Sequence, residues 1–130
     1  MSVELNHTIV PAHDKEASAA FLAGILGLEP AKPWGPFMVL DVGNGLSLDF
    51  IDGGDRDFDT HHYAFLVSDD EFDPIFERIL ASGAPWYADP HHTQPKEINH
   101  RDGGRGIYFD DPDGHNLEVI TRPYGSTPGG

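Results

Sequence analysis

Two histidines and two carboxylates lie at matched positions in the two halves of this chain. His7 is part of the apolar stretch "LNHTIV", and His62 is part of a second one, "HHYAFLV". Asp49 and Glu118 each follow a glycine by four residues, in "GLSLD" and "GHNLE". Imidazole nitrogens and carboxylate oxygens are ligands for divalent metals, so the four positions together suggest one metal site.

The number of carboxylates decides which metal chemistry such a site would support. Two histidines and one carboxylate form the facial triad of non-haem Fe2+, with open positions for substrate and oxygen. Two histidines and two carboxylates suit an octahedral Zn2+, Ni2+, Co2+ or Mn2+ that acts as a Lewis acid. The alternatives are a satisfied core histidine at His7 and ion pairs of the carboxylates with Arg105 or Arg122. Repetition of the pattern in both halves favours the metal.

The first half predicts a strand, a helix and a hairpin. The segment "ELNHTIV", residues 4–10, is typical of a strand, and Asp14 is a suitable N-cap for a helix that ends at Gly27. After a proline-rich connection, "FMVLDV" and "LSLDFI" flank "GNG". This arrangement indicates a β-hairpin.

The second half repeats this order. "HHYAFLV" predicts a strand, Asp69 predicts the cap of a helix that ends at Gly83, and "WYAD" predicts a short strand. A polar loop over residues 89–105 precedes two strands, "GIYFDD" and "HNLEVIT", on either side of "PDG". His62 precedes Asp69 by seven residues, as His7 precedes Asp14.

We therefore expect an α+β fold in which two tandem βαβββ modules form an open, curved mixed β-barrel with the helices outside. A chain of 130 residues is long enough for one domain. The expected boundaries are about 4–52 for module 1, 61–122 for module 2 and 124–130 for a flexible tail.

Composition limits the class of protein. A net charge of −14 argues against nucleic-acid partners and anionic membranes, which need a basic face. The chain has no cysteine, no run of transmembrane length and no signal-peptide pattern, so we expect a soluble cytoplasmic protein. Three basic residues lie close together in the polar loop, and we expect them to bind an acidic group of a substrate: Lys96, Arg101 and Arg105.

Four segments, "LNHTIV", "AFLAGILGL", "THHYAFLV" and especially "YFDDPDGHNLEV", resemble those of the vicinal oxygen chelate superfamily. This superfamily includes glyoxalase I, fosfomycin- and bleomycin-resistance proteins and extradiol dioxygenases, and the resemblance covers about residues 4–124. It implies metal ligands at His7, His62 and Glu118, with His61 pointing to the opposite side of its strand. It also implies a homodimer, in which modules of two chains often complete each site.

Two positions separate the members of this superfamily. Glyoxalase I-like enzymes have a glutamate where this chain has the shorter Asp49, the fourth candidate ligand. Fosfomycin-resistance proteins and extradiol dioxygenases both place a tyrosine ten residues before the ligand glutamate, as Tyr108 is placed here; the alternative for this tyrosine is simple packing. In the dioxygenases it hydrogen-bonds a catechol, and a separate histidine acts as acid or base, for which His100 or His92 is available. The fosfomycin pattern is broken at Ile9 and by a loop without serine.

The expected function is therefore that of a divalent-metal-dependent enzyme that chelates neighbouring oxygens of a small-molecule substrate. Ring-cleaving dioxygenase, lyase or isomerase, and resistance transferase are the candidate activities, with Tyr108 and His100 as candidate catalytic residues. The metal is Fe2+, or Ni2+, Zn2+, Mn2+ or Co2+. The alternative is a non-catalytic protein that sequesters a drug or metabolite, as bleomycin-resistance proteins do. In that case four aromatic side chains would line the binding groove: Trp34, Phe37, Trp86 and Tyr87.

Overall fold

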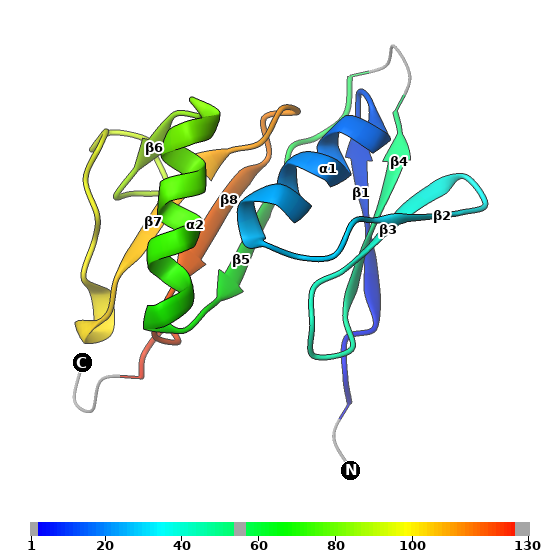
Figure 1. The fold of residues 1–130 in the computed structure, drawn as a ribbon. Coiled ribbons are helices and arrows are strands. Elements are labelled where there is room, and N and C mark those ends of the chain that lie inside the picture. Colours follow the sequence, from blue (N-terminus) through cyan, green and yellow to red (C-terminus); the bar gives the residue numbers. More distant parts are fainter. Residues whose placement is uncertain (1–2, 54–56, 127–130) are drawn as a thin grey trace. The chain divides into compact units, whose positions relative to one another are not determined.

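The computed structural model describes residues 3–53 and 57–126, and the chain divides into two compact units, Met1–Asp59 and Thr60–Gly130. Each unit contains one α-helix and one mixed four-stranded sheet (Figure 1). The two-module α+β organisation expected from the repeat is therefore confirmed. Among the described residues the strands form two separate open sheets and no closed barrel.

The first unit has a sheet in the order β1-β4-β3-β2, in which β1 is parallel to β4 and the other pairs are antiparallel. Its helix begins after Asp14, whose carboxylate accepts hydrogen bonds from the amides of Glu16 and Ala17, and it ends at Gly27 with a φ of 71°. The elements are β1 (His7–Ala12), α1 (Lys15–Leu26), β2 (Lys32–Trp34), β3 (Phe37–Asp41) and β4 (Ser47–Asp52).

Strand β2 falls in the segment that the sequence predicts to be a connection. It is three residues long and lies at the edge of its sheet, where Pro33 can be accommodated although it has no amide hydrogen to donate. Prolines at positions 30, 33 and 36 hide this strand from a pattern-based prediction.

The second unit repeats the topology, with the order β5-β8-β7-β6 and with β5 parallel to β8. The short strand expected at "WYAD" is present as β6, and the polar loop contains a short 3-10 helix, η1. The elements are β5 (His62–Leu66), α2 (Asp69–Ser82), β6 (Trp86–Tyr87), η1 (Arg101–Gly103), β7 (Gly106–Asp110) and β8 (Asn116–Ile120).

The N-cap of α2 is Ser68, and the prediction of Asp69 at this position is wrong by one residue. The Ser68 hydroxyl accepts a hydrogen bond from the Glu71 amide at 3.1 Å, and the Glu71 carboxylate accepts one from the Ser68 amide at 2.9 Å. This reciprocal capping box satisfies two amide donors at the start of the helix. Asp69 would satisfy neither in this way, and it lies in the first turn instead.

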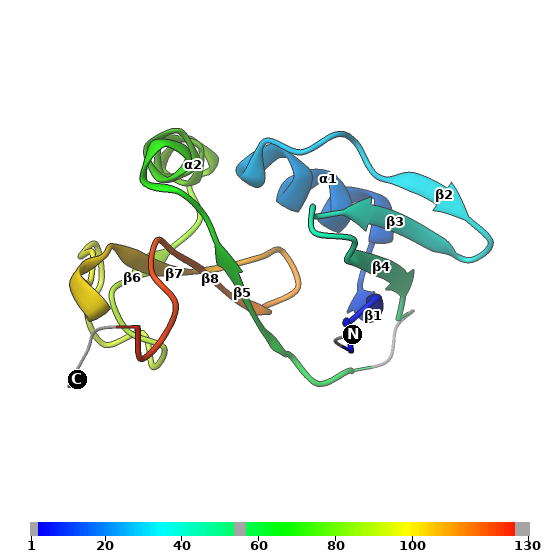
Figure 2. The ribbon, with the colours of Figure 1, turned by 90° about the horizontal axis from the view of Figure 1, so that it is seen from below.

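In each unit the helix covers one face of its own sheet, as Figure 2 shows. Alternation along the strands sends one set of side chains into the core beneath the helix and the other set to the opposite, open face. Buried residues of the first unit include Val10, Leu40, Leu48 and Phe50, and those of the second unit include Phe72, Ile79, Ile107, Phe109 and Val119. The candidate ligands belong to the opposite set.

Candidate metal centre

His62 and Glu118 face each other on adjacent parallel strands. The register pairs Ala64 with Glu118, and His62 lies two residues before Ala64, so both functional side chains are on the same face of the sheet. His62 Nε2 lies 3.0 Å from Glu118 Oε1. The Glu118 side chain is fully buried, whereas the His62 side chain is 45% exposed. The pair is therefore accessible from the imidazole side.

A backbone carbonyl determines which nitrogen of His62 carries the proton. His62 Nδ1 lies 2.8 Å from the carbonyl oxygen of Asn116, and a carbonyl can only accept, so Nδ1 donates. In the neutral ring, Nε2 then presents a lone pair to a carboxylate oxygen, and two acceptors face each other. Either a second ring proton or a cation must lie between them, and a metal ligand whose second nitrogen donates to a carbonyl has this arrangement.

The distance between the two atoms also suits a metal. Two neighbouring ligands at right angles, each with a bond of about 2.1 Å to one ion, would be about 3 Å apart. The residues present in the second unit thus fit a divalent cation in donor type, tautomer and separation.

The second oxygen of Glu118 is held by a tyrosine that sequence reasoning missed. The Tyr124 hydroxyl donates to Glu118 Oε2 at 2.5 Å and lies 2.9 Å from the Tyr108 hydroxyl. Arg101 in turn donates to the Tyr108 hydroxyl at 2.7 Å. Desolvation of the hydroxyl, followed by its hydrogen bond to Glu118, raises the pKa of Tyr124 far above its usual range, so the hydroxyl keeps its proton although the rest of the residue is exposed. Tyr124 belongs to the segment expected to be a flexible tail, and residues 127–130 of that segment lie outside the described part of the chain, so the tail stays a prediction.

In the first unit, His7 and Asp49 lie on the open face of their sheet. His7 pairs with Ser47 and Asp49 with Ile9 in the parallel register of β1 and β4, so all four residues share a face. His7 Nδ1 lies 2.7 Å from the side-chain oxygen of Asn6 and donates to it, so the neutral ring has its lone pair on Nε2, the same tautomer as in His62. The Ser47 hydroxyl donates to Asp49 at 2.9 Å. His7 and Asp49 belong to the other unit from His62 and Glu118, and their joining in one site stays a prediction.

A pocket of about 810 Å³ opens on the same face of the first unit. His7 and Asp49 are part of its lining, and Trp34, with 71% of its surface exposed, is at the same pocket. Lys32 and Glu29 add one charge of each sign. The pocket combines an apolar wall with groups able to orient a polar ligand.

The three basic residues of the loop do not act as one cluster. Arg105 pairs with Asp73 at 2.7 Å and lies over the ring of Phe72, so it connects the loop to α2. Arg101 is engaged by Tyr108, and this hydrogen bond raises the pKa of its guanidinium. Lys96 lines a separate pocket beside Trp86. These contacts explain the arginines structurally, and a substrate-binding role for the three stays a prediction.

The two loop histidines that were candidates for acid–base chemistry have different surroundings. His92 stacks on Tyr87 with ring centres 4.0 Å apart, and its Nε2 lies 3.1 Å from the side-chain oxygen of Asn116. His100 Nδ1 lies 3.1 Å from the carbonyl oxygen of Gly104 and therefore donates to it. Asn116 thus contacts both His62 and His92. The sequence feature that could have pointed to this residue is its position two residues before Glu118 in "HNLEV", on the same side of the strand.

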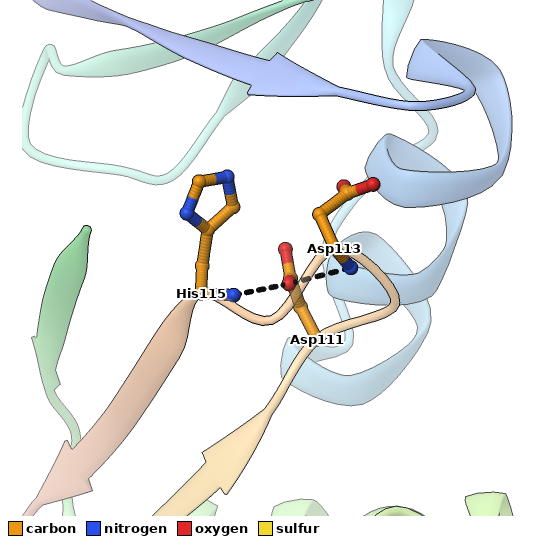
Figure 3. A group of neighbouring side chains, drawn as sticks. All are labelled: Asp111, Asp113 and His115. Carbon is orange, nitrogen blue, oxygen red and sulfur yellow. Dashed lines mark hydrogen bonds between the residues drawn. The ribbon is translucent and has the colours of Figure 1, made fainter. Parts of the chain in front are cut away.

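A further group of ligand-type side chains lies in the turn between β7 and β8 (Figure 3). Single ligand atoms of Asp111, Asp113 and His115 lie within 4.8 Å of one another. Asp111 Oδ1, however, accepts hydrogen bonds from the amides of Asp113 and His115 at 2.9 and 2.8 Å, and His115 Nδ1 accepts one from the His61 amide. Burial raises the pKa of Asp111. These hydrogen bonds stabilise the tight turn, and this structural role explains why the three side chains lie together.

Comparison with known proteins agrees with the fold. Residues 4–119 match the Glyoxalase/Bleomycin resistance protein/Dioxygenase superfamily. The structure named "Oxidase ChaP-H2" is 60% identical, with a TM-score of 0.94 over 98% of this chain and 99% of that one. "Oxidase ChaP-H1" is 61% identical, with a TM-score of 0.92 over 96% and 100% of the two chains. "Metallothiol transferase FosB" of Lysinibacillus sphaericus (strain C3-41) is 30% identical over 90% of this chain and 81% of that protein.

This chain therefore belongs to the glyoxalase/bleomycin resistance protein/dioxygenase superfamily, and the expected resemblance is confirmed. The similar proteins carry the names of enzymes, two oxidases and a metallothiol transferase. Within the described residues, no helix has the length and apolar character needed to cross a bilayer.

Proposed function

We propose that this chain is a divalent-metal-dependent oxidase that binds a small substrate through two neighbouring oxygens and uses O2 as the oxidant. The observation that carries the proposal is the His62–Glu118 pair, in which Nε2 lies 3.0 Å from a carboxylate oxygen while Nδ1 donates to the carbonyl of Asn116. The two similar proteins named as oxidases, at 60% and 61% identity over nearly the whole chain, support oxidation over transfer or isomerisation.

In this proposal His62, Glu118 and His7 hold the metal. Two histidines and one carboxylate suit Fe2+ and leave positions open for other ligands. When bound, the metal would supply Lewis-acid binding of the substrate oxygens and a redox centre. Asp49, already engaged by Ser47, is proposed to lie beside the site as an alternative fourth ligand.

The protein groups around the metal would bind and orient the substrate. The pocket that contains His7 offers Trp34 for contact with an apolar part of the substrate, and Lys32 for an acidic one. Tyr108, fully engaged between Arg101 and Tyr124, is suited to fix the position of neighbouring groups rather than to exchange protons with solvent. His100 remains a proposed acid–base residue.

The proposal is tested by metal analysis followed by oxygen uptake. The full chain would be purified anaerobically, loaded with Fe2+ or with Zn2+, and mixed with a series of catechols and ortho-hydroxyquinones. Uptake of O2 by the Fe2+ form and none by the Zn2+ form is expected. Turnover that is equal with both metals would point to an isomerase or transferase and would contradict the oxidase assignment.

A second candidate function is metal-free sequestration of a drug or metabolite, and the 810 Å³ pocket beside Trp34 is the observation that favours it. Calorimetric titration separates the two. Stoichiometric binding of an aromatic ligand to metal-free protein, without turnover in the Fe2+ form, would support sequestration.

A homodimer is proposed with either function, and sedimentation equilibrium measures it directly.

A further inference from the structure

We propose that Tyr124 is a positioning residue that holds one oxygen of Glu118, so that only the other oxygen faces His62. This inference rests on the proposed function, because it concerns how Glu118 would bind the metal. Its basis is a row of four side chains connected by hydrogen bonds: Arg101, Tyr108, Tyr124 and Glu118.

The direction of every hydrogen bond in this row is determined by its two ends. A guanidinium has no acceptor, so Arg101 donates to the Tyr108 oxygen. A carboxylate has no proton, so it accepts from the Tyr124 hydroxyl. Tyr124 has then used its only proton, and the bond of 2.9 Å between the two hydroxyls must run from Tyr108 to Tyr124. All donors therefore point towards Glu118 Oε2.

This directed row divides the two carboxylate oxygens into different roles. Oε2 accepts a hydrogen bond strengthened by the charge of Glu118, at 2.5 Å from the Tyr124 oxygen. Oε1 faces His62 Nε2. The Glu118 side chain is fully buried, so bulk solvent does not reach Oε2 in this conformation.

The short helix η1 contacts Tyr108 directly and contacts the segment that carries Tyr124. Arg101 is its first residue, and the next residue, Asp102, accepts a hydrogen bond from the Gly125 amide at 3.1 Å. The Ser126 amide closes the turn by donating to the Pro123 carbonyl. Backbone hydrogen bonds thus attach the segment 123–126 to η1, next to Tyr108. Its residue surface is 56% exposed.

Removal of the Tyr124 hydroxyl should change metal binding without damaging the fold. With no donor at Oε2, the carboxylate can rotate or present both oxygens to the ion. Loss of a partner of this kind typically lowers metal affinity by about 10- to 100-fold. The variant Tyr124→Phe retains the ring, and because the side chain is largely exposed it leaves no core cavity.

The experiment titrates the full-length protein with Co2+ and records the visible spectrum together with affinity. Tyr63→Phe is the matched control, because Tyr63 follows His62 in the same strand but lies on the other face. We expect Tyr124→Phe to bind Co2+ at least 10-fold more weakly and with shifted absorption bands. Tyr63→Phe should match the unaltered protein in both respects. Arg101→Met, which removes the first donor, should shift the bands in the same direction but less.

The outcomes separate this inference from the proposed function. If the unaltered protein binds Co2+ and Tyr124→Phe gives the same affinity and spectrum, the role of Tyr124 is refuted while the metal site stands. If the unaltered protein binds no Co2+, the proposed function itself fails, and the inference with it. Should Tyr124→Phe unfold, Arg101→Met decides: an unchanged spectrum in that variant overturns the inference.

Discussion

Nε2 of His62 and Oε1 of Glu118 lie 3.0 Å apart although 56 residues separate them in the sequence. Their proximity follows from two ordinary features of a sheet, the parallel register of β5 and β8 and the alternation of side chains. The adjacent His61 lies outside the strand, and its ring stacks on that of His115 at 5.9 Å. The two neighbouring histidines therefore make different contacts: His62 with Glu118, and His61 with His115.

This relationship predicts that metal binding depends on His62 and not on His61. His62→Ala and Glu118→Ala each remove a proposed ligand, and both should lower metal affinity at least 100-fold. His61→Ala should retain full occupancy. Mass-spectrometric metal analysis of the three variants, purified in parallel, measures this. Equal losses in the two histidine variants would refute the assignment, as would full occupancy in Glu118→Ala.

Removal of the metal should lower the thermal stability of the unaltered protein. A cation that binds only the folded state stabilises it by about 2.7 kcal/mol at 100 times its Kd. A chelator should therefore lower the melting temperature of the unaltered protein by several degrees and leave that of Glu118→Ala almost unchanged. Differential scanning calorimetry with and without the chelator gives both values. A similar drop in both proteins would mean that the ion binds elsewhere.

The loop that leads to His92 should become less stable in acid because of Asp89. Desolvation raises the pKa of Asp89, but hydrogen bonds from the hydroxyl and amide of Thr93 and the amide of Gln94 outweigh it and lower this pKa from 3.8 to about 2. The carboxylate thus stabilises the folded chain above about pH 4, and this contribution is lost as the pH falls towards 2. Asp89→Ala should melt earlier than the unaltered protein at pH 7, with a smaller difference at pH 3.

Thr93→Ala is the matched variant for this test. It removes one donor and leaves both amide donors, so its effect at pH 7 should be smaller and of the same sign. A difference between Asp89→Ala and the unaltered protein that grows as the pH falls would contradict the assigned pKa shift.

The start of α2 offers a stability test that separates two adjacent residues. Ser68→Ala removes the N-cap and should lower the free energy of unfolding by about 1 kcal/mol. Asp69→Ala loses only a first-turn charge and a distant contact of 3.6 Å with Arg105, and should cost about 0.5 kcal/mol. Urea denaturation of both variants measures the order, and the reverse order would show that Asp69 is the more important residue at this terminus.

Much of the fold could be predicted from local patterns. Apolar periodicity and glycine positions indicated both helices and the hairpin strands, and the spacing of His7 and His62 indicated two copies of one module. The family resemblance, together with the seven-residue spacing to Asp69, selects His62 over His61 as a ligand, and this choice stays a prediction. These features depend on residues close together in the chain, for which sequence periodicity is informative.

The rest depends on contacts that local patterns do not encode. Tyr124 lies in "YGSTPGG", which has no apolar periodicity, and its role follows from the path of the chain after Pro123. The sequence shows that Arg105 is a charged loop residue, but not that it forms an ion pair with Asp73, which lies 32 residues earlier. The error at Ser68 is different in kind, because the pattern S-x-x-E that marks a capping box was present in the sequence.

Asn116 makes three contacts whose combination ties a surface loop to a candidate ligand. Its backbone carbonyl accepts a hydrogen bond from His62 Nδ1 and so orients that ring. Its side-chain nitrogen donates to the Pro90 carbonyl, and its side-chain oxygen lies 3.1 Å from His92 Nε2. A shift of the loop that contains Pro90 and His92 would pull on one residue and turn the imidazole of another. Substitutions in that loop would therefore alter the affinity of the proposed metal centre without changing any of its proposed ligands.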